Sequence, residues 1–107
     1  MTQQEKSSSE DDIIYWKNIG DNYFKEGDYL SALDAYQTVI RTDRKNLDAW
    51  KGVATVFSLL NKHYEALESL DKAIEIDPTD IESLEIKGLI LEKLLEENQE
   101  EINRLKS

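Results

Sequence analysis

The sequence predicts an all-α protein made of two complete helix–turn–helix units and a third, incomplete one. Apolar and small residues stand three or four positions apart, as in Trp16, Ile19, Gly20 and Tyr23, and this is the period of an α-helix rather than of a strand. The same spacing returns at an offset of 34 residues, beginning with Trp50. A repeat of that length is typical of stacked helix pairs. The chain has 107 residues, which suits one domain.

The two units match in chemistry at many positions. The matched pairs include Trp16 with Trp50, Ile19 with Val53, Tyr23 with Phe57, Ala32 with Ala66, Leu33 with Leu67, Ile40 with Ile74, and Asp43 with Asp77. A third step of the same length reaches Leu84, Gly88 and Leu91, so a third unit begins there. The expected division is a disordered polar tail at 1–11 and a repeat domain at 12–107, with repeat one at 13–46, repeat two at 47–80, and a partial third repeat or capping helix at 81–107.

Turn and cap residues divide each unit into two helices. The periodicity predicts helices at about 12–25, 29–42, 47–60 and 63–76, with a last helix from about 80 onward. Gly27 and Asn61 stand at equivalent places between the helices of a unit, and both residue types tolerate the left-handed backbone that ends a helix. Asn46 and Asp80 precede new apolar runs, where their side chains can cap the next helix.

These residues resemble the tetratricopeptide repeat (TPR) family, whose pattern is W-x2-L-G-x2-Y, then A-x3-F, then a proline. The first unit carries Trp16, Ile19, Gly20, Tyr23, Ala32 and Tyr36, and the second carries Trp50, Val53, Ala54, Phe57, Ala66, Leu70 and Pro78. The first unit departs from the pattern at Arg44, where the proline would be. The resemblance covers about residues 13–95. It implies an α-solenoid of antiparallel helix pairs, whose first helices line a concave groove that binds a protein or peptide.

The third unit departs further from the pattern. Leu95 stands at the turn position, and Glu100 stands where a small alanine would pack. Leu91, Leu94, Leu95, Asn98, Ile102 and Leu105 instead keep one helical face through the place of the turn. We therefore expect one long helix from about residue 80 to 105, with a bend near Glu97 left open. It would cover the second repeat as the cap that a repeat array needs.

Charge and hydropathy exclude several classes of function. The chain has 23 acidic and 13 basic residues and a formal charge of -10, which would repel nucleic-acid phosphates and anionic lipid. No segment reaches the roughly 20 apolar residues of a membrane span, and the start of the chain lacks the pattern of a signal peptide. We expect a cytoplasmic protein that binds neither nucleic acid nor membrane.

No group of residues in the sequence supports catalysis. The chain has no cysteine and one histidine, His63, so neither a metal site nor a His-assisted nucleophile can be assembled. His63 is expected at the surface, at the head of a helix. The carboxylates of Glu96, Glu97, Glu100 and Glu101 lack the glycine turn of a calcium loop. The expectation is no enzyme activity, no metal and no cofactor.

The groove is therefore the expected place of function. Its predicted lining is Lys17, Asp21, Phe24, Lys25, Asp48, Lys51, Thr55, Leu59, Glu82, Glu85, Leu89 and Glu92. In TPR proteins that bind chaperones, a Lys, two Asn, a Lys and an Arg hold the carboxylates of an acidic peptide tail. Lys17 matches the first of these residues. Asp21 and Gly52 stand in place of the two Asn, and Glu82 and Ile86 stand in place of the second Lys and the Arg.

These substitutions predict an adaptor that binds apolar-basic segments in preference to acidic ones, because the carboxylates would repel an acidic tail. Two alternatives remain open. The first alternative is a structural protein that forms homo-oligomers through its repeat ends, since fewer than three complete repeats are present. The second alternative is a co-chaperone with a non-standard clamp.

Overall fold

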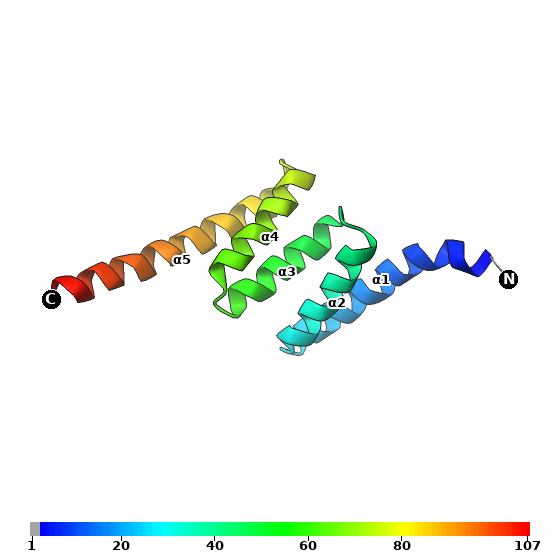
Figure 1. Cartoon of the computed structure of the whole chain (residues 1–107), viewed down its shortest axis with the longest axis horizontal. Coiled ribbons are helices and arrows are strands. Elements are labelled where there is room, and N and C mark those ends of the chain that lie inside the picture. The colour runs from blue at the N-terminus through cyan, green and yellow to red at the C-terminus, as the bar shows by residue number, and fades with distance from the viewer. Residues whose placement is uncertain (1–2) are drawn as a thin grey trace.

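The computed structural model describes the backbone of residues 3–107 and the side chains of residues 9–107. This part of the chain is all-helical (Figure 1). Its helices are α1 (Gln3–Lys25), α2 (Tyr29–Thr42), α3 (Leu47–Leu59), α4 (His63–Ile76) and α5 (Ile81–Lys106). Each helix packs on the one that follows it, so α1 with α2 and α3 with α4 form stacked pairs, and α5 packs on the second pair. The predicted solenoid of two helix pairs and a capping helix is confirmed.

The turn and cap signals also act as predicted. Gly27 has a φ of 81° and Asn61 a φ of 61°, so both residues end the first helix of a pair in the left-handed region. Asn46 and Asp80 each accept a 3.0 Å hydrogen bond from the backbone N–H three residues farther on. Asp28 caps α2 in the same way, at 3.2 Å. Local sequence signals thus set the lengths of the helices from α2 onward.

Small residues allow the helices to approach closely. The buried side chains form one cluster of Ala32, Tyr36, Val53 and Val56, and a second cluster of Ala54, Ala66, Leu70 and Ile90. Ala32 and Ala66, which the repeat pattern pairs, are both fully buried. A larger side chain at either place would have to displace a neighbouring helix. The close helix contacts therefore repeat every 34 residues, as the sequence does.

The first helix begins earlier than expected. α1 begins at Gln3, whereas the sequence predicts a disordered tail over residues 1–11, and residues 1–2 lie outside the described part of the chain. Neither Gly nor Pro interrupts this segment, and extending a helix that is already packed needs no new nucleus. Residues 9–12 are exposed, as their polarity predicts.

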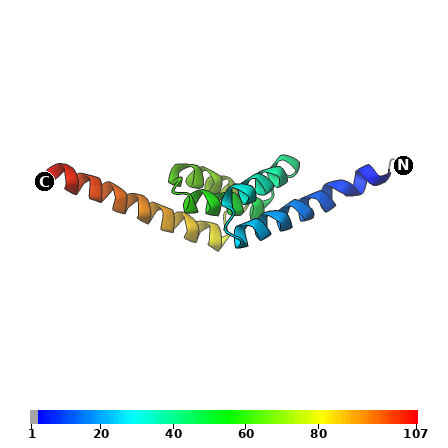
Figure 2. The ribbon, with the colours of Figure 1, turned by 90° about the horizontal axis from the view of Figure 1, so that it is seen from below.

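The last helix is one continuous element, as predicted. α5 passes Glu97 without a break and projects beyond the array at the end opposite to α1 (Figure 2). The face that covers the second repeat, however, differs from the predicted face. Ile90 is buried and Leu94 packs beside it, whereas Leu91 and Leu95 are exposed.

The repeat itself explains this correction. Gly20 of α1 faces Tyr36 of α2, the second helix of its own pair. Gly88 is the equivalent residue of α5, and no atom of the described chain lies within 4 Å of where its Cβ would be. The side of α5 that carries Leu84, Gly88 and Leu91 therefore points to the place where a second helix of a third pair would lie.

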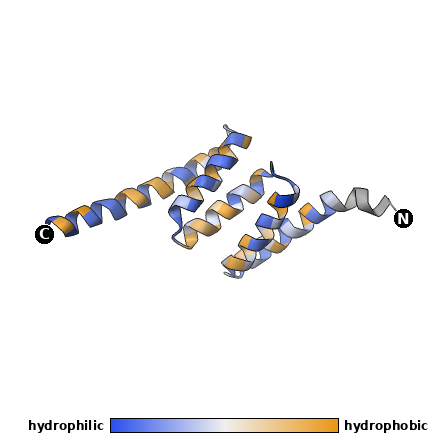
Figure 3. Cartoon of the chain, in the orientation of Figure 1, coloured by the Kyte–Doolittle hydropathy of each residue, from blue (hydrophilic) through white to orange (hydrophobic). Residues whose placement is uncertain are grey.

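Polar and apolar residues alternate along the helices, and apolar residues continue along α5 toward its C-terminal end (Figure 3). Among the described helices, none combines the length and the hydrophobicity that crossing a membrane requires.

Candidate functional site

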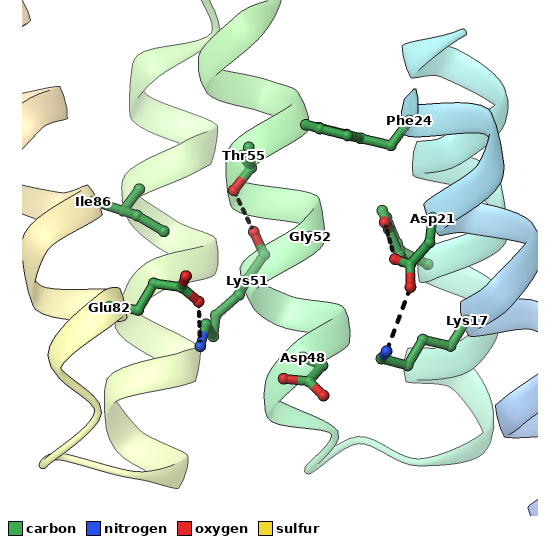
Figure 4. Close-up of a pocket in the computed structure, with 10 residues that line it drawn as sticks. Lys17, Asp21, Phe24, Asp48, Lys51, Gly52, Thr55, Glu82 and Ile86 are labelled. Carbon is green, nitrogen blue, oxygen red and sulfur yellow. Dashed lines mark hydrogen bonds and ion pairs between the residues drawn. The ribbon is translucent and has the colours of Figure 1, made fainter. Parts of the chain in front are cut away.

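A hollow of about 390 Å³ opens between the first helices of the successive pairs, α1, α3 and α5 (Figure 4). Its lining is Lys17, Asp21, Phe24, Tyr36, Asp48, Lys51, Gly52, Thr55, Glu82 and Ile86. Stacking brings these residues together because equivalent positions on neighbouring first helices face the same side. The volume lies within the range of ligand-binding pockets.

Tyr36 of α2 also lines the hollow, whereas its place in the sequence predicts only a role in the repeat motif. Its ring lies between two glycines. A Cβ on Gly20 would lie 2.7 Å from Tyr36 Cε1, and a Cβ on Gly52 would lie 2.8 Å from Cε2. The signal was present in the sequence as two glycines at facing positions of consecutive first helices. Only glycine at both places leaves room for an aromatic ring that reaches the groove.

The Tyr36 hydroxyl fixes one carboxylate of the groove. It donates a 2.6 Å hydrogen bond to Asp21 Oδ1. Burial raises the pKa of Tyr36 above its ordinary value, and the bond to Asp21 adds to the rise. The hydroxyl therefore stays protonated and remains a donor to Asp21 throughout the neutral range.

Both lysines of the hollow are held by carboxylates. Lys17 Nζ lies 3.4 Å from Asp21 Oδ2, one helical turn away. Lys51 Nζ lies 3.1 Å from Asp80 Oδ2 and also pairs with Glu82. The Lys51 side chain is only 14% exposed, so this pair is shielded from solvent more than a typical surface pair is. Neither lysine is free to act as an isolated cation.

Asp80 joins Lys51 to the start of α5. Its carboxylate accepts hydrogen bonds from the hydroxyl and the backbone N–H of Ser83, at 2.6 and 3.0 Å. These bonds, together with Lys51, lower the pKa of Asp80. Desolvation lowers the pKa of Lys51, but its bonds to Glu82 and Asp80 outweigh that effect and raise the value. The pair is therefore charged at neutral pH.

The predicted groove residues fall into three groups. Those that line the hollow are Lys17, Asp21, Phe24, Asp48, Lys51, Thr55 and Glu82. Glu85, Leu89 and Glu92 line a neighbouring hollow of about 460 Å³, which also includes Glu82, Ile86 and Gly88. Lys25 and Leu59 line neither hollow. Together, the two hollows give the concave side an acidic character.

The structure brings the five clamp positions together. They are Lys17, Asp21, Gly52, Glu82 and Ile86, and all five line the first hollow. The five positions therefore share one hollow, whereas the donor groups that the family resemblance implies are absent at four of them. The one matching residue, Lys17, is paired with Asp21.

His63 is buried, which corrects the surface position expected for it. Its side chain is 7% exposed, and its Nε2 lies 3.5 Å from Glu97 Oε1 of α5. The helix that continues through the expected turn covers His63. Within residues 9–107, no three His, Asp or Glu side chains form a group that could hold a metal ion.

A family model described as tetratricopeptide repeat matches residues 23–89. The chain is 30% identical over 92 residues to Hsp70-Hsp90 organizing protein 2 of Arabidopsis thaliana. It is 34% identical over 74 residues to stress-induced-phosphoprotein 1 of Caenorhabditis elegans. These matches cover 79% and 69% of this chain but 16% and 22% of the relatives. The chain thus spans about a fifth of their length.

Solved structures with similar folds include two TPR domains with peptide or protein partners. The TPR2B domain of yeast Sti1, in a complex with pHsp70, gives a TM-score of 0.76 at 24% identity and covers 79% of this chain and 68% of that one. The second TPR of Spaghetti (RPAP3), bound to the HSP90 peptide SRMEEVD, gives a TM-score of 0.76 at 27% identity. This match covers 91% of this chain and 86% of that one. At 24% identity, the likeness to the TPR2B domain of Sti1 shows the fold alone.

Proposed function

The chain belongs to the tetratricopeptide repeat family of protein-interaction modules, and we propose that its groove binds an extended segment that combines apolar and basic residues. One observation carries this proposal: both groove lysines are already paired with carboxylates of the same chain. The charge left for a ligand to meet is therefore negative.

The carboxylates outnumber the cations along the concave side. Lys17 and Lys51 are the cations among the lining residues. The carboxylates are those of Asp21, Asp48, Glu82, Glu85 and Glu92. Asp48 and Glu85 form no ion pair with any side chain in residues 9–107. They can accept a Lys or Arg of a ligand without breaking an existing pair. The formal charge of -10 adds long-range attraction for a basic segment.

Apolar side chains supply the other half of the surface. Phe24 and Ile86 line the first hollow, and Leu89 lines the second and is exposed. These residues stand between the carboxylates along the groove. A ligand that alternates apolar and basic residues would bury the first kind and pair the second.

An acidic tail such as SRMEEVD, which RPAP3 binds, fits this groove less well. It would have to separate Lys17 from Asp21 and Lys51 from Asp80, leaving two carboxylates beside the incoming ones. For Lys51 and Asp80, whose side chains are only 14% and 19% exposed, leaving a desolvated charge without its partner costs more than a new pair at the surface returns.

The test is a titration of matched peptides by fluorescence anisotropy. SRMEEVD is compared with SRMKKVK, in which lysines replace the three acidic residues. We expect the lysine peptide to bind with a Kd on the order of micromolar, to bind more weakly as salt rises, and to bind at least about tenfold more tightly than the acidic peptide. Tighter binding of SRMEEVD that is lost in Lys17→Ala would instead establish a carboxylate clamp.

A pair of charge reversals locates the binding surface. Glu85→Lys changes a lining carboxylate, and Glu68→Lys makes the same change on an exposed residue of α4 outside both hollows. The first variant should weaken binding of the lysine peptide about tenfold, or about 1.4 kcal/mol, and the second by less than about twofold. Equal losses in both variants would mean that net charge alone drives binding.

A further inference from the structure

Beyond Glu97, whose carboxylate lies beside His63 of α4, the C-terminal part of α5 has no partner within the described chain. Every residue from 95 to 107 is exposed, yet the helix continues to Lys106 (Figures 1 and 2). Leu95 is 68% exposed and Leu105 is 74% exposed. Most of the stability of a helix in a protein comes from packing its apolar face. A helix with large apolar residues on one face therefore implies an occupant for that face.

The exposed apolar residues follow a heptad pattern. Positions alternate by four and three residues through Leu84, Gly88, Leu91, Leu95, Asn98, Ile102 and Leu105, which makes three heptads. Such a seam with charges beside it is typical of a coiled coil. We propose that a second copy of this chain occupies the seam, and that the two α5 helices form a parallel, two-stranded coiled coil. This inference does not depend on the proposed ligand of the groove.

The charges beside the seam favour a second copy over an unrelated partner. Lys87 and Glu92 flank its first half, and Glu101 and Lys106 flank its second half. Within one copy Lys87 pairs with Asp71 and Glu101 pairs with Arg104, and these exposed pairs would have to exchange for pairs between copies. In a parallel pair, Lys87 of one copy lies near Glu92 of the other, and Glu101 lies near Lys106, because each pair is five residues apart. Opposite charges also meet in the antiparallel arrangement. The charge pattern therefore supports self-pairing without fixing its direction.

Asn98 fixes the direction. In the parallel pair, Asn98 faces Asn98 of the second copy, and the two amides can hydrogen-bond to each other. In the antiparallel pair that aligns the seams, Asn98 faces Leu95, and its amide is buried without a partner. Burying an unpaired amide is costly, so the arrangement in which the two Asn98 amides meet is the favoured one.

The rest of the fold leaves room for the second copy. Gly88 lies in the seam with open space beside it, so a helix can approach there closely. Ile90 and Leu94, which pack on the second repeat, lie about a quarter to a third of a turn away from the seam. Leu89, in the groove, lies on the other side of the helix. A dimer would thus display two open grooves, and a ligand with two binding segments would gain avidity.

Sedimentation equilibrium of the full chain tests the dimer, with two matched variants. Leu95→Glu removes a seam leucine, and Leu89→Glu makes the same change at a leucine of α5 that is 65% exposed and lies outside the seam. The wild type and Leu89→Glu should have twice the mass of one chain at tens of micromolar. Leu95→Glu should have the mass of one chain and a weaker helical circular dichroism signal with its cooperative unfolding retained, because only the freed end of α5 loses its packing. A monomeric wild type, or a dimer that survives Leu95→Glu, would overturn the proposal.

Disulfide trapping tests the direction, because the chain has no cysteine of its own. In the parallel pair, Ile102→Cys faces itself and should form a disulfide dimer under mild oxidation. In the antiparallel pair the two copies of residue 102 would be about 16 Å apart along the axis, and Ile102→Cys would instead link to Leu91→Cys. A mixture that yields only the heterodimeric disulfide would overturn the parallel arrangement.

Discussion

The two interfaces between neighbouring helix pairs fill equivalent gaps with different side chains. At the first interface, the ring of Tyr36 lies between Gly20 and Gly52. One repeat later, Leu70 packs with Ala54 and Ile86 in the second core cluster. Each of these three positions is 34 residues from its counterpart. A large side chain between two glycines and a medium side chain between larger neighbours are two ways to fill one space at the density that protein interiors require.

This difference has a consequence for the groove. Tyr36 carries a hydroxyl to the concave side, where it holds Asp21 and, through Asp21, Lys17. Leu70 is fully buried and brings no polar group to that side. At the second interface the lysine of the groove, Lys51, is held instead by Asp80 at the start of the next helix. At the first interface, Tyr36 thus serves both the packing and the polar network. At the second interface, Leu70 serves the packing, and Lys51 and Asp80 form the polar pair.

The largest effect should come from removing the central side chain of each interface. Tyr36→Ala is expected to lower the free energy of unfolding by about 3–5 kcal/mol, and Leu70→Ala by about 2–5 kcal/mol. The loss at Tyr36 should be the greater one, because the glycines beside it have no side chains that could move into the cavity. Urea denaturation measures both values. Tyr36→Phe, which keeps the ring, should lose only about 0.5–1.5 kcal/mol. A smaller loss for Tyr36→Ala than for Leu70→Ala would contradict the comparison.

A second experiment converts the first interface into the second type. Gly52→Ala should cost about 1–3 kcal/mol because its Cβ would meet the Tyr36 ring. Combined with Tyr36→Leu, the same alanine should cost less, since the smaller side chain leaves room for the methyl group. The coupling between the two changes, measured by a double-mutant cycle in urea, should be at least about 1 kcal/mol. Additive losses would mean that the two positions do not share one space.

Gly88→Ala provides the matched control for that cycle. Gly88 is also a glycine within a helix, but no atom of the described chain lies within 4 Å of its Cβ position. At a protein concentration where the chain is monomeric, alanine should therefore stabilise the protein there by about 0.5–1 kcal/mol, through helix propensity alone. Destabilisation at Gly88 would show that helical context, rather than the Tyr36 ring, explains the effect at Gly52.

Most of the fold could be predicted because its determinants are local or periodic. The 34-residue offset sets the pairing of the helices, and residues such as Gly27 and Asn61 mark the turns by their backbone preferences. The continuous last helix followed from Leu95 and Glu100, which suit neither a turn nor a tight crossing. These signals require no knowledge of distant contacts.

The errors have a different origin. Periodicity showed that α5 has an apolar face, and Leu94 is covered as predicted. The missing second helix of the third pair decides that Ile90, rather than Leu91 and Leu95, is covered beside it. His63 is buried for a related reason, since α5 extends over it. In the groove, the repeat pattern gave most of the lining. The pairing of Lys51 with Asp80 depends on the angle between two helices, which sequence spacing does not encode.

The smallest effect should distinguish the two caps that stand one repeat apart, Asn46 and Asp80. Only Asp80 of this pair titrates, and its pKa is lowered from the ordinary value of 3.8 by its bonds to Ser83 and Lys51. A carboxyl with a lowered pKa stabilises the fold above its unfolded pKa, and this contribution is lost as the pH falls through the folded value. The wild type should therefore lose stability below about pH 4 more steeply than Asp80→Asn, which keeps a capping oxygen without the charge.

Thermal melting of both proteins between pH 7 and pH 2.5 measures this difference, and Asn46→Asp serves as the matched control. The control places an ionisable cap at the equivalent position of α3, away from Lys51 and Asp80, so its acid dependence should be shallower than that of Asp80. Since other carboxylates titrate in the same range, the difference between variants, rather than the slope of any one of them, isolates the cap. Identical profiles for the wild type and Asp80→Asn would show that Lys51 and Ser83 do not stabilise the Asp80 carboxylate, and that the second interface is held by its apolar contacts alone.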